Sequence, residues 1–458
     1  MEKLFEKLKK IKKTPMHMPG HKRNGKAFPY LKGFAHIDIT EIKDFDNLHN
    51  PSGILKASMD YAAQKRGADA AFYLVNGTTC GILAAICAVL DKGDKVIMAR
   101  NCHKSVYNGI ELAGAEPIFV YPEFNNKYGI SGSVNPLDVA LKMEENPDTK
   151  LIIITSPTYE GVISDIAEIC RLAHKKNIPV LVDAAHGAHL GFSGFSESAV
   201  KLGADICVES LHKTLPSLTQ TAVCYICRNL VSKDKFAEKL AVFETSSPSY
   251  ILLSSIDGCI NFINEQGHGI FEKWNKNLDF FYEKTSKLKN IEIIRGGEGF
   301  FDFDRSKIVI FPKNQSGAEL AKTLRNEDIE PEMVAPHYVI CMTGAGDTKR
   351  SLKRLANAIY KADKTVKYSI RPNIFAEFGE STNVSFNSAL KREKVFCKMK
   401  VAEDKISAGY IWVYPPGVPV LVPGEKISQK LIESLAGFQK NGAELFGNIK
   451  DGEILVIK

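Results

Sequence analysis

Short apolar runs alternate with longer segments of helical spacing between residues 60 and 230. The segments 78–90 and 165–176 predict helices, and the second ends at the stop signal Asn177-Ile178-Pro179. The apolar runs predict strands at 95–98, 117–121, 151–155, 180–183, 204–208 and 222–227. Such alternation predicts an α/β fold with a mostly parallel central sheet covered by helices.

The regular alternation fades near residue 260, where a helix over 277–288 and Gly-rich turns at 296–299 and 344–346 are expected. We therefore expect a second, smaller α+β domain. The first residues, 1–11, carry apolar side chains with helical spacing and predict an amphipathic helix that docks on this subunit or on a partner. The expected division is an N-terminal arm over 1–59, a large domain over 60–260 and a C-terminal domain over 261–458.

Two charged residues follow neighbouring strands of the expected sheet. Asp183 ends the run 180–183, and Lys213 lies in Ser210-Leu211-His212-Lys213-Thr214, just after the run 204–208. Right-handed crossovers place the carboxyl ends of parallel strands at one edge, so Asp183 and Lys213 are expected to face one pocket. A lysine there, flanked by a hydroxyl and an imidazole, is suited to form a Schiff base with an aldehyde cofactor, and pyridoxal phosphate is the candidate. The alternative for Lys213 is an ordinary surface charge.

Asp183 is an acid at the end of a Val- and Leu-rich run, where a carboxylate is costly without a partner. A protonated pyridine nitrogen is such a partner, and a ring that keeps this proton is an electron sink. A helix cap or a metal ligand is the alternative role for Asp183.

Asn76-Gly77-Thr78-Thr79 precedes an apolar helix, and a turn at a helix N-terminus offers free N–H groups, hydroxyls and a favourable dipole to a phosphate. Ser210 and His212 would add donors to the same phosphate. Thr78 or Thr79 is alternatively a simple N-cap.

Three histidines also fall near the expected strand ends. His103 follows the run 95–98, where its imidazole either stacks on the cofactor ring or lies in a surface loop. His186 and His189 suggest zinc together with Asp183, but Gly187 and the absence of a helical period argue against a metal site. His186 is expected near the substrate carboxylate or the cofactor.

Composition narrows the class of protein. The net charge of +7 is dispersed, without a basic block interleaved with aromatic residues, so nucleic acid is not expected as a partner. The longest apolar stretch of the first half, 82–90, is far shorter than the roughly 20 residues of a membrane-spanning helix. The ten cysteines are scattered through apolar segments, which favours a reducing cytoplasm over a disulfide framework. Cys224 and Cys227 lie in a strand-like run where they point to opposite faces, so they do not suggest a metal or redox site.

The ordered motifs of the chain resemble those of the prokaryotic ornithine/lysine/arginine decarboxylases, pyridoxal-phosphate enzymes of the aspartate-aminotransferase fold. The resemblance covers nearly the whole chain. Its stretches are 14–22 (TPMHMPGHK), 38–41 (DITE), 75–79 (VNGTT), 100–105 (RNCHKS), 183–187 (DAAHG), 210–214 (SLHKT), 219–222 (TQTA), 245–250 (TSSPSY) and 414–419 (YPPGVP). The last stretch is also expected to form a rigid structural turn.

The resemblance implies pyridoxal-phosphate-dependent fold type I, with the large domain binding the cofactor. It also implies residue roles. Lys213 carries the Schiff base, Asp183 pairs with the pyridine nitrogen and His103 stacks on the ring, while Gly77, Thr78, Thr79, Ser210 and His212 surround the phosphate. Lys213, Asp183, His186 and His212 form the implied catalytic set. Pro216 replaces a small residue of the strictest lysine motif, which affects only the expected loop shape.

The implied reaction is decarboxylation of a basic L-amino acid to CO2 and a polyamine precursor, with arginine favoured over lysine and ornithine. The cationic far end of the substrate side chain requires carboxylates in the site, and Glu330 and Glu332 are the candidates. The alternative is that both are ordinary surface acids. The chain resembles the short form without a receiver-like N-terminal domain, so a cytoplasmic homodimer or tetramer is expected. The other functions to separate are an aminotransferase or carbon–carbon lyase of the same fold, a catalytically silent regulatory relative, and a metal hydrolase.

Overall fold

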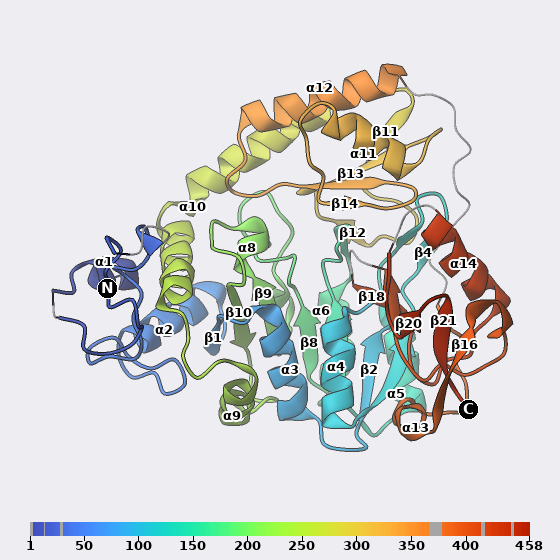
Figure 1. Cartoon of the computed structure of the whole chain (residues 1–458), viewed down its shortest axis with the longest axis horizontal. Helices are drawn as coiled ribbons and strands as arrows, with labels where there is room; N and C mark the ends of the chain where they lie inside the picture. Colours follow the sequence, from blue (N-terminus) through green and yellow to red (C-terminus); the bar gives the residue numbers. More distant parts are fainter. Residues whose placement is uncertain (1–2, 13, 28–30, 366–377, 414–416, 441–443) are drawn as a thin grey trace. The chain divides into compact units, whose positions relative to one another are not determined.

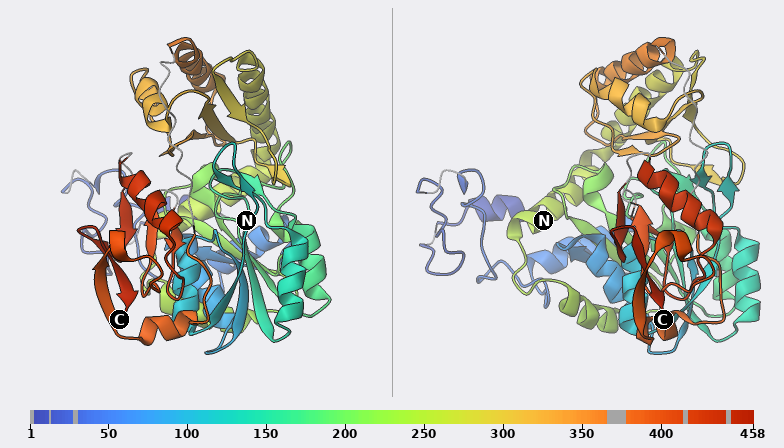
Figure 2. Two further views of the ribbon diagram at one scale, coloured as in Figure 1. Left: turned by 90° about the vertical axis from the view of Figure 1, so that its right-hand side faces the viewer. Right: turned by 45° about the vertical axis from the view of Figure 1, so that its right-hand side comes forward.

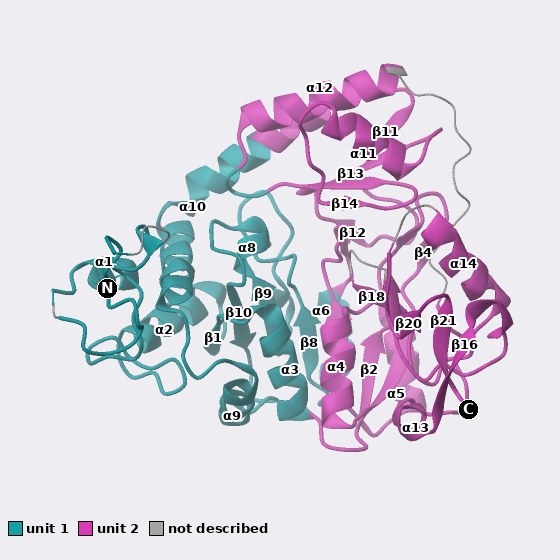
Figure 3. Ribbon diagram, viewed as in Figure 1, with its two compact units in different colours: residues 1–89, 166–276, 344–346 teal, residues 90–165, 277–343, 347–458 magenta. Residues whose placement is uncertain are grey.

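A computed structural model describes residues 3–12, 14–27, 31–365, 378–413, 417–440 and 444–458. The chain forms two compact units, and each unit draws on separate stretches of the sequence (Figure 3). Unit 1 contains residues 1–89, 166–276 and 344–346. Unit 2 contains residues 90–165, 277–343 and 347–458. The division expected at 59/60 and 260/261 stays a prediction.

Seven strands form the large sheet, in the order β1-β10-β9-β8-β6-β2-β3 (Figure 1). The pairs β8 with β9, β2 with β3 and β2 with β6 are parallel. Strand β10 pairs antiparallel with both β1 and β9, so β10 runs opposite to its two neighbours and β1 runs in the same direction as β9. The mostly parallel α/β fold predicted from the alternation is therefore confirmed, with the reversed strand β10 next to the edge strand β1.

Unit 1 contributes strands β1, β10, β9 and β8 to the large sheet. The β8 residues are all buried, as expected for a parallel strand covered on both faces. Helix α2 ends at Gly67, and α7 ends at Gly203, and both glycines have the left-handed conformation of a helix C-cap. The elements of this unit are α1 (Leu4–Lys9), α2 (Ile54–Arg66), β1 (Ala70–Leu74), α3 (Gly77–Val89), α6 (Ile166–His174), β8 (Val180–Asp183), α7 (Ala199–Leu202), β9 (Ile206–Ser210), α8 (Leu211–Thr214), β10 (Ala222–Ile226), α9 (Lys233–Phe243) and most of α10 (Tyr250–Lys284).

Gly81 lets α3 approach two strands closely. A Cβ atom built at Gly81 would lie 2.6 Å from Leu74 Cδ1 and 3.1 Å from Val208 Cγ1. Real Cβ atoms do not tolerate the first distance, so a larger side chain would push α3 away from β1 and β9. The absence of a side chain at Gly81 thus sets where the N-terminus of α3 stands.

The N-terminal helix α1 docks on unit 1. Leu4 and Leu8 are completely buried, which confirms the apolar face predicted from the spacing. The carboxylate of Asp257 in α10 accepts a hydrogen bond from the Leu4 backbone N–H at 3.0 Å. The same carboxylate accepts hydrogen bonds from Ser58 and Asn261, so α1, α2 and α10 meet at one buried acid.

Unit 2 combines strands of the large sheet with smaller sheets. A four-stranded sheet has the order β11-β13-β15-β14, and two three-stranded sheets have the orders β16-β21-β20 and β18-β17-β19. The elements are β2 (Lys95–Ala99), α4 (Lys104–Ala113), β3 (Glu116–Val120), β4 (Phe124–Asn125), β5 (Ile130–Ser131), α5 (Pro136–Glu145), β6 (Thr149–Thr155), β7 (Val162–Ile163), β11 (Ile291–Ile294), β12 (Asp302–Phe303), β13 (Lys307–Pro312), α11 (Gly317–Arg325), β14 (Met333–Val334), β15 (Val339–Met342), α12 (Lys349–Thr365), α13 (Phe386–Lys391), β16 (Lys394–Lys398), a 3-10 turn (Met399–Val401), β17 (Ile411–Val413), β18 (Val418–Leu421), α14 (Gln429–Lys440), β19 (Leu445–Gly447), β20 (Ile449–Lys450) and β21 (Glu453–Ile457).

The last part of the chain has its own apolar core. Leu431 and Leu435 of α14 pack with Ile411, Leu421 and Val456 from three strands. Helix α14, drawn in red, runs beside these strands in both views of Figure 2. This arrangement agrees with the predicted smaller α+β domain at the C-terminus.

The expected strands match β2, β3, β6, β8, β9 and β10 to within two residues at each end. Strand β1 was not expected, although Gly67 marks the end of the helix before it. The helix expected over 277–288 was misplaced, since α10 begins at Tyr250 and ends at Lys284. Gly267 and Gly269 interrupt its pattern, but burial of Phe271 and Trp274 outweighs the low helix propensity of glycine.

Across the described ranges, no helix combines the length and the apolar character needed to cross a bilayer. In the proline-rich stretch 414–419, the first three residues, Tyr414, Pro415 and Pro416, lie outside the described residues.

We predict that Gly81→Val lowers the free energy of unfolding by about 1–3 kcal/mol, because its side chain overlaps Leu74 and Val208. Urea unfolding followed by circular dichroism measures the change. Gly269→Ala is the control: Gly269 lies in α10, and an added methyl group there would have no neighbouring atom within 4 Å. That control should gain about 0.5–1 kcal/mol from helix propensity. Equal stability of Gly81→Val and the unmodified protein would contradict the packing described for α3.

Candidate active site

The end of β9 presents Lys213 on the short helix α8. Its Nζ lies 2.8 Å from Nε2 of His186, in the loop that follows β8. His186 is buried, with 7% of its surface exposed. An amine and an imidazole at this distance share one proton, so the pair can carry a proton to or from a reacting group.

Asp183 lies at the end of β8, the parallel neighbour of β9, and is 3% exposed. Burial raises the pKa of Asp183, while the charge of Lys213 and the N–H of Ala185 act in the opposite direction. The Ala185 N–H donates to Asp183 Oδ1 at 3.1 Å. A carboxyl group in this setting is stabilised as an anion by a cation placed beside it. The sequence-based expectation that Asp183 and Lys213 face the same region is supported within unit 1.

The turn before α3 meets the end of β9. Gly77 has a φ angle of +75°, which favours glycine, and it opens α3 directly after Asn76. Ser210 Oγ and Thr78 Oγ1 are 3.5 Å apart. Thr79 is exposed, whereas Ser210 is buried. Two hydroxyls beside the N-terminus of a 13-residue helix make a setting suited to an anion such as a phosphate.

His212 has a defined tautomer. Its Nδ1 lies 3.0 Å from the carbonyl oxygen of Thr221, which only accepts, so Nδ1 carries the proton. Burial lowers the pKa of His212, with the charge of Lys213 acting in the same direction. The neutral ring therefore keeps a lone pair on Nε2. In this form Nε2 accepts hydrogen bonds, and the place of His212 beside the phosphate stays a prediction.

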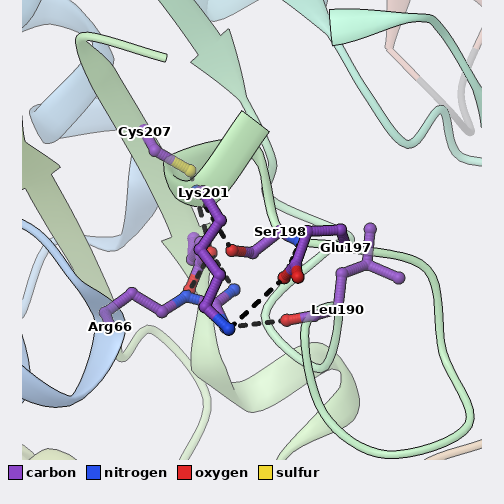
Figure 4. A network of polar contacts seen from close by, with 7 residues as sticks. Arg66, Leu190, Glu197, Ser198, Lys201 and Cys207 are labelled. Carbon is purple, nitrogen blue, oxygen red and sulfur yellow. Dashed lines mark hydrogen bonds and ion pairs between the residues drawn. The ribbon is translucent and has the colours of Figure 1, made fainter. Parts of the chain in front are cut away.

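A buried ion pair supports β9 from its other face. Successive strand residues point to opposite faces, so Glu209 and Ser210 point apart. Arg66 at the end of α2 donates to Glu209 Oε1 through both Nε and Nη2, and through Nη1 to the Leu190 carbonyl at 2.7 Å. Figure 4 shows Arg66 within a network that includes Leu190, Glu197 and Lys201. The network joins α2, the loop after β8 and α7 to the strand that precedes Lys213.

His103 belongs to unit 2, where it forms the N-cap of α4. Its Nδ1 accepts a hydrogen bond from the Ser105 N–H at 3.2 Å and lies 2.8 Å from Ser105 Oγ. Arg100, at the end of β2, is completely buried and binds Glu425 through two hydrogen bonds of 2.8 Å. The Lys104 N–H donates to the Gly417 carbonyl at 3.1 Å. The C-terminal segment thus fixes the backbone on both sides of His103.

The two candidate carboxylates of unit 2 differ in their contacts. Glu330 binds the Arg325 guanidinium, and its side chain is 71% exposed. Glu332 accepts a hydrogen bond of 2.6 Å from the Tyr159 hydroxyl, in the loop after β6. Both acids are exposed, but Glu330 is paired with its own cation, whereas Glu332 binds a hydroxyl in the loop at the carboxyl end of β6.

Sequence reasoning missed several residues that shape these regions. Glu209 sits inside an apolar run just as Asp183 does, so the same argument from burial could have identified it. Glu425 and Glu244 gave no such signal, because their buried partners lie far away along the chain. Among the residues that the structure describes, no group of three His, Cys, Asp or Glu side chains is arranged to hold a metal ion.

Comparison with known proteins then identifies the family. The model of the Orn/Lys/Arg decarboxylase major domain matches residues 2–298, and that of the family's C-terminal domain matches residues 375–448. The chain belongs to the Orn/Lys/Arg decarboxylase family. The arginine decarboxylase of Bacillus subtilis is 33% identical over 451 residues, which cover 93% of this chain and 92% of that protein.

Solved structures agree on the fold. The lysine decarboxylase LdcF of Francisella novicida aligns with a TM-score of 0.82 at 20% identity, covering 99% of this chain and 80% of that one. A structure of SPT with PLP aligns with a TM-score of 0.55 at 16% identity, over 68% of this chain and 76% of that one. The fold is therefore that of the type I pyridoxal-phosphate enzymes. This family member is a decarboxylase of basic amino acids, and its cofactor is pyridoxal phosphate.

The described side chains of unit 1 suit this cofactor. An amine at Lys213, a buried carboxyl at Asp183 and hydroxyls at Thr78 and Ser210 match an aldehyde, a pyridine nitrogen and a phosphate in chemical type. Gly77 leaves the backbone accessible at the phosphate end.

We predict that Asp183→Asn lowers kcat about 100-fold while the protein keeps its bound cofactor, because only the charge that favours the protonated ring is lost. Cofactor content is read from the absorbance of the purified protein, and kcat from CO2 release. Asp205→Asn is the control: this buried acid accepts from the Val180 N–H and contacts His174, both at 2.8 Å. It should lose about 1–3 kcal/mol of stability with little change in rate per bound cofactor. Equal losses of rate in both variants would contradict the role given to the Asp183 charge.

Proposed function

We propose that this enzyme decarboxylates L-arginine to CO2 and agmatine at pyridoxal phosphate held by the end of β9. The observation that carries this proposal is the Lys213–His186 contact of 2.8 Å beside a buried Asp183. Gly77, Thr78, Thr79 and Ser210 are proposed to receive the phosphate. His103 is proposed to stack on the ring.

Each side chain then has a defined task. When bound, pyridoxal phosphate would supply an electron sink for the bonding pair that stays on Cα as CO2 leaves. Asp183 holds a proton on the ring nitrogen by its negative charge. The amine of Lys213 returns a proton to Cα, and His186 supplies that proton through Nε2. His212 keeps a lone pair on Nε2, since its Nδ1 proton is donated to the Thr221 carbonyl.

Arginine is favoured by the relative from Bacillus subtilis, an arginine decarboxylase that aligns over nearly its whole length. A guanidinium requires carboxylates in a fork geometry. Glu332 is supported for this role by its hydrogen bond to Tyr159. Glu330 is already paired with Arg325, which makes it the weaker of the two proposed substrate ligands.

We also propose that the enzyme is a cytoplasmic homodimer or tetramer and that it acts in polyamine synthesis. All ten cysteines are free, as suits a reducing compartment. Several large apolar side chains of unit 1 are exposed, among them Leu218 and Val242 at 45% and 71%. Exposed apolar side chains of this size are typical of surfaces that bind another subunit.

We predict that Lys213→Ala abolishes both the yellow colour of the bound cofactor and CO2 release, because no amine remains to hold the aldehyde. Arginine, lysine and ornithine are supplied separately, and the amine formed from each is identified. Lys239→Ala, an exposed lysine of α9, is the matched control and should retain colour and rate. Turnover by Lys213→Ala would refute the proposed site. A transaminated product would refute decarboxylation as the main reaction.

We predict that Glu332→Gln raises KM for arginine about tenfold or more, since a charge-assisted hydrogen bond to the guanidinium is weakened. Glu330→Gln should change KM less than twofold, because this acid binds Arg325 at the surface. Steady-state kinetics with arginine measures both. The reverse order of effects would assign substrate recognition to Glu330.

A further inference from the structure

Glu244 is a buried carboxyl group directly behind the turn that opens α3. It follows α9 as the C-cap residue and is only 5% exposed. Its Oε1 accepts a hydrogen bond from the Val75 backbone N–H, two residues before Gly77. The Asn76 side chain donates to the Phe243 carbonyl at 3.4 Å. The end of α9 therefore holds the turn through both residues that precede Gly77.

The carboxyl group is incompletely bonded. Glu244 Oε2 is buried and has no hydrogen-bond partner among the described residues. No cation forms an ion pair with it in the described part of the chain, in contrast to the acids Glu209 and Glu425. A buried carboxylate without a cation is costly, and its charge acts on nearby groups through a medium of low dielectric constant.

Two other titratable groups in the described ranges face Glu244. The His49 imidazole, from the segment before α2, favours the ionised carboxylate, and its Nε2 lies 2.8 Å from the Thr245 carbonyl. The Cys80 thiol on α3 has its pKa raised by burial and by Glu244. Of these two groups, His49 is the one whose interaction favours the Glu244 anion.

We propose that Glu244 is a positioning residue for the cofactor phosphate: it holds the turn before α3 and weakens phosphate binding when its carboxyl group is ionised. This inference rests on the phosphate site proposed above. The neutral acid keeps the hydrogen bond to Val75 through its carbonyl oxygen. The anion keeps that bond as well, but places a negative charge behind the helix N-terminus that receives the phosphate.

The transition falls near neutral pH. Burial raises the pKa of Glu244 to about 7, with the Val75 N–H and His49 opposing the shift. In the unfolded chain a glutamate titrates at about pH 4.3. Between these values only the folded protein binds the proton, so the stability contributed by the neutral acid is complete at low pH and is lost as the pH rises toward 7. Phosphate affinity should fall as the pH rises through 7, where the folded protein loses this proton.

Glu244→Gln tests the inference, since the amide keeps an oxygen for Val75 and cannot ionise. Apoenzyme is titrated calorimetrically with pyridoxal phosphate and with pyridoxal, which lacks the phosphate, at pH 6 and pH 8. We predict that Glu244→Gln binds pyridoxal phosphate about tenfold more tightly than the unmodified protein at pH 8 and equally at pH 6. Pyridoxal should bind both proteins equally at each pH. The melting temperature of the unmodified apoprotein should fall between pH 5 and 7. The melting temperature of apo Glu244→Gln should not show this fall.

Two further variants complete the test. Glu238→Gln removes an exposed acid from the same helix and should behave like the unmodified protein. His49→Asn leaves Glu244 in place but removes the neighbouring imidazole, so the loss of phosphate affinity should move to higher pH. This variant keeps the inference testable if Glu244→Gln does not fold.

The inference is overturned if Glu244→Gln and the unmodified protein bind pyridoxal phosphate equally at pH 8. It is also overturned if the variant loses affinity equally at both pH values, which would indicate a purely structural role. If the unmodified protein is yellow and releases CO2, either of these results leaves the proposed function intact. An unmodified protein without colour or CO2 release would instead refute the proposed function itself.

Discussion

Parallel pairing of β8 with β9 is the constraint on which the chemistry depends. It brings the buried acid at the end of one strand and the lysine after the other to the same end of unit 1. The strands are apolar and fully buried, so their register is set by packing on both faces. A slip of one residue would turn Asp183 and Ser210 to the wrong faces. The catalytic geometry is therefore determined by the burial of residues that never touch the substrate.

Buried charges hold the elements around this pairing. Arg66 with Glu209 supports β9 from behind, and Arg100 with Glu425 supports the strand end before His103. Breaking one partner of such a pair leaves an unpaired buried charge, which costs about 3–5 kcal/mol. Asp257 plays a similar role for α1, because its carboxylate accepts a hydrogen bond from the Leu4 backbone N–H. Each of these acids therefore orders a backbone segment as well as a side chain.

Much of the fold and the centre of the site could be predicted because their signals are local. The strand runs and the Asp183 and Lys213 motifs lie in short, strongly patterned segments. The long helix α10 was misplaced because its glycines hide a pattern that tertiary burial sustains. The tautomer of His212 and the roles of Glu244 and Glu425 could not be foreseen, since each depends on a partner that is distant in sequence. Glu330 and Glu332 look equivalent in sequence, and only their neighbours Arg325 and Tyr159 separate them.

The Arg100–Glu425 pair has a consequence for synthesis of the chain. Its two residues are separated by 325 positions. At about 5–20 residues per second, roughly 16 to 65 seconds pass between the translation of the two. During that time the guanidinium must stay in water or find a temporary partner, because burial without an acid is unfavourable. The His103 segment therefore acquires its final surroundings only when the last tenth of the protein leaves the ribosome, and the nascent enzyme stays incomplete until then.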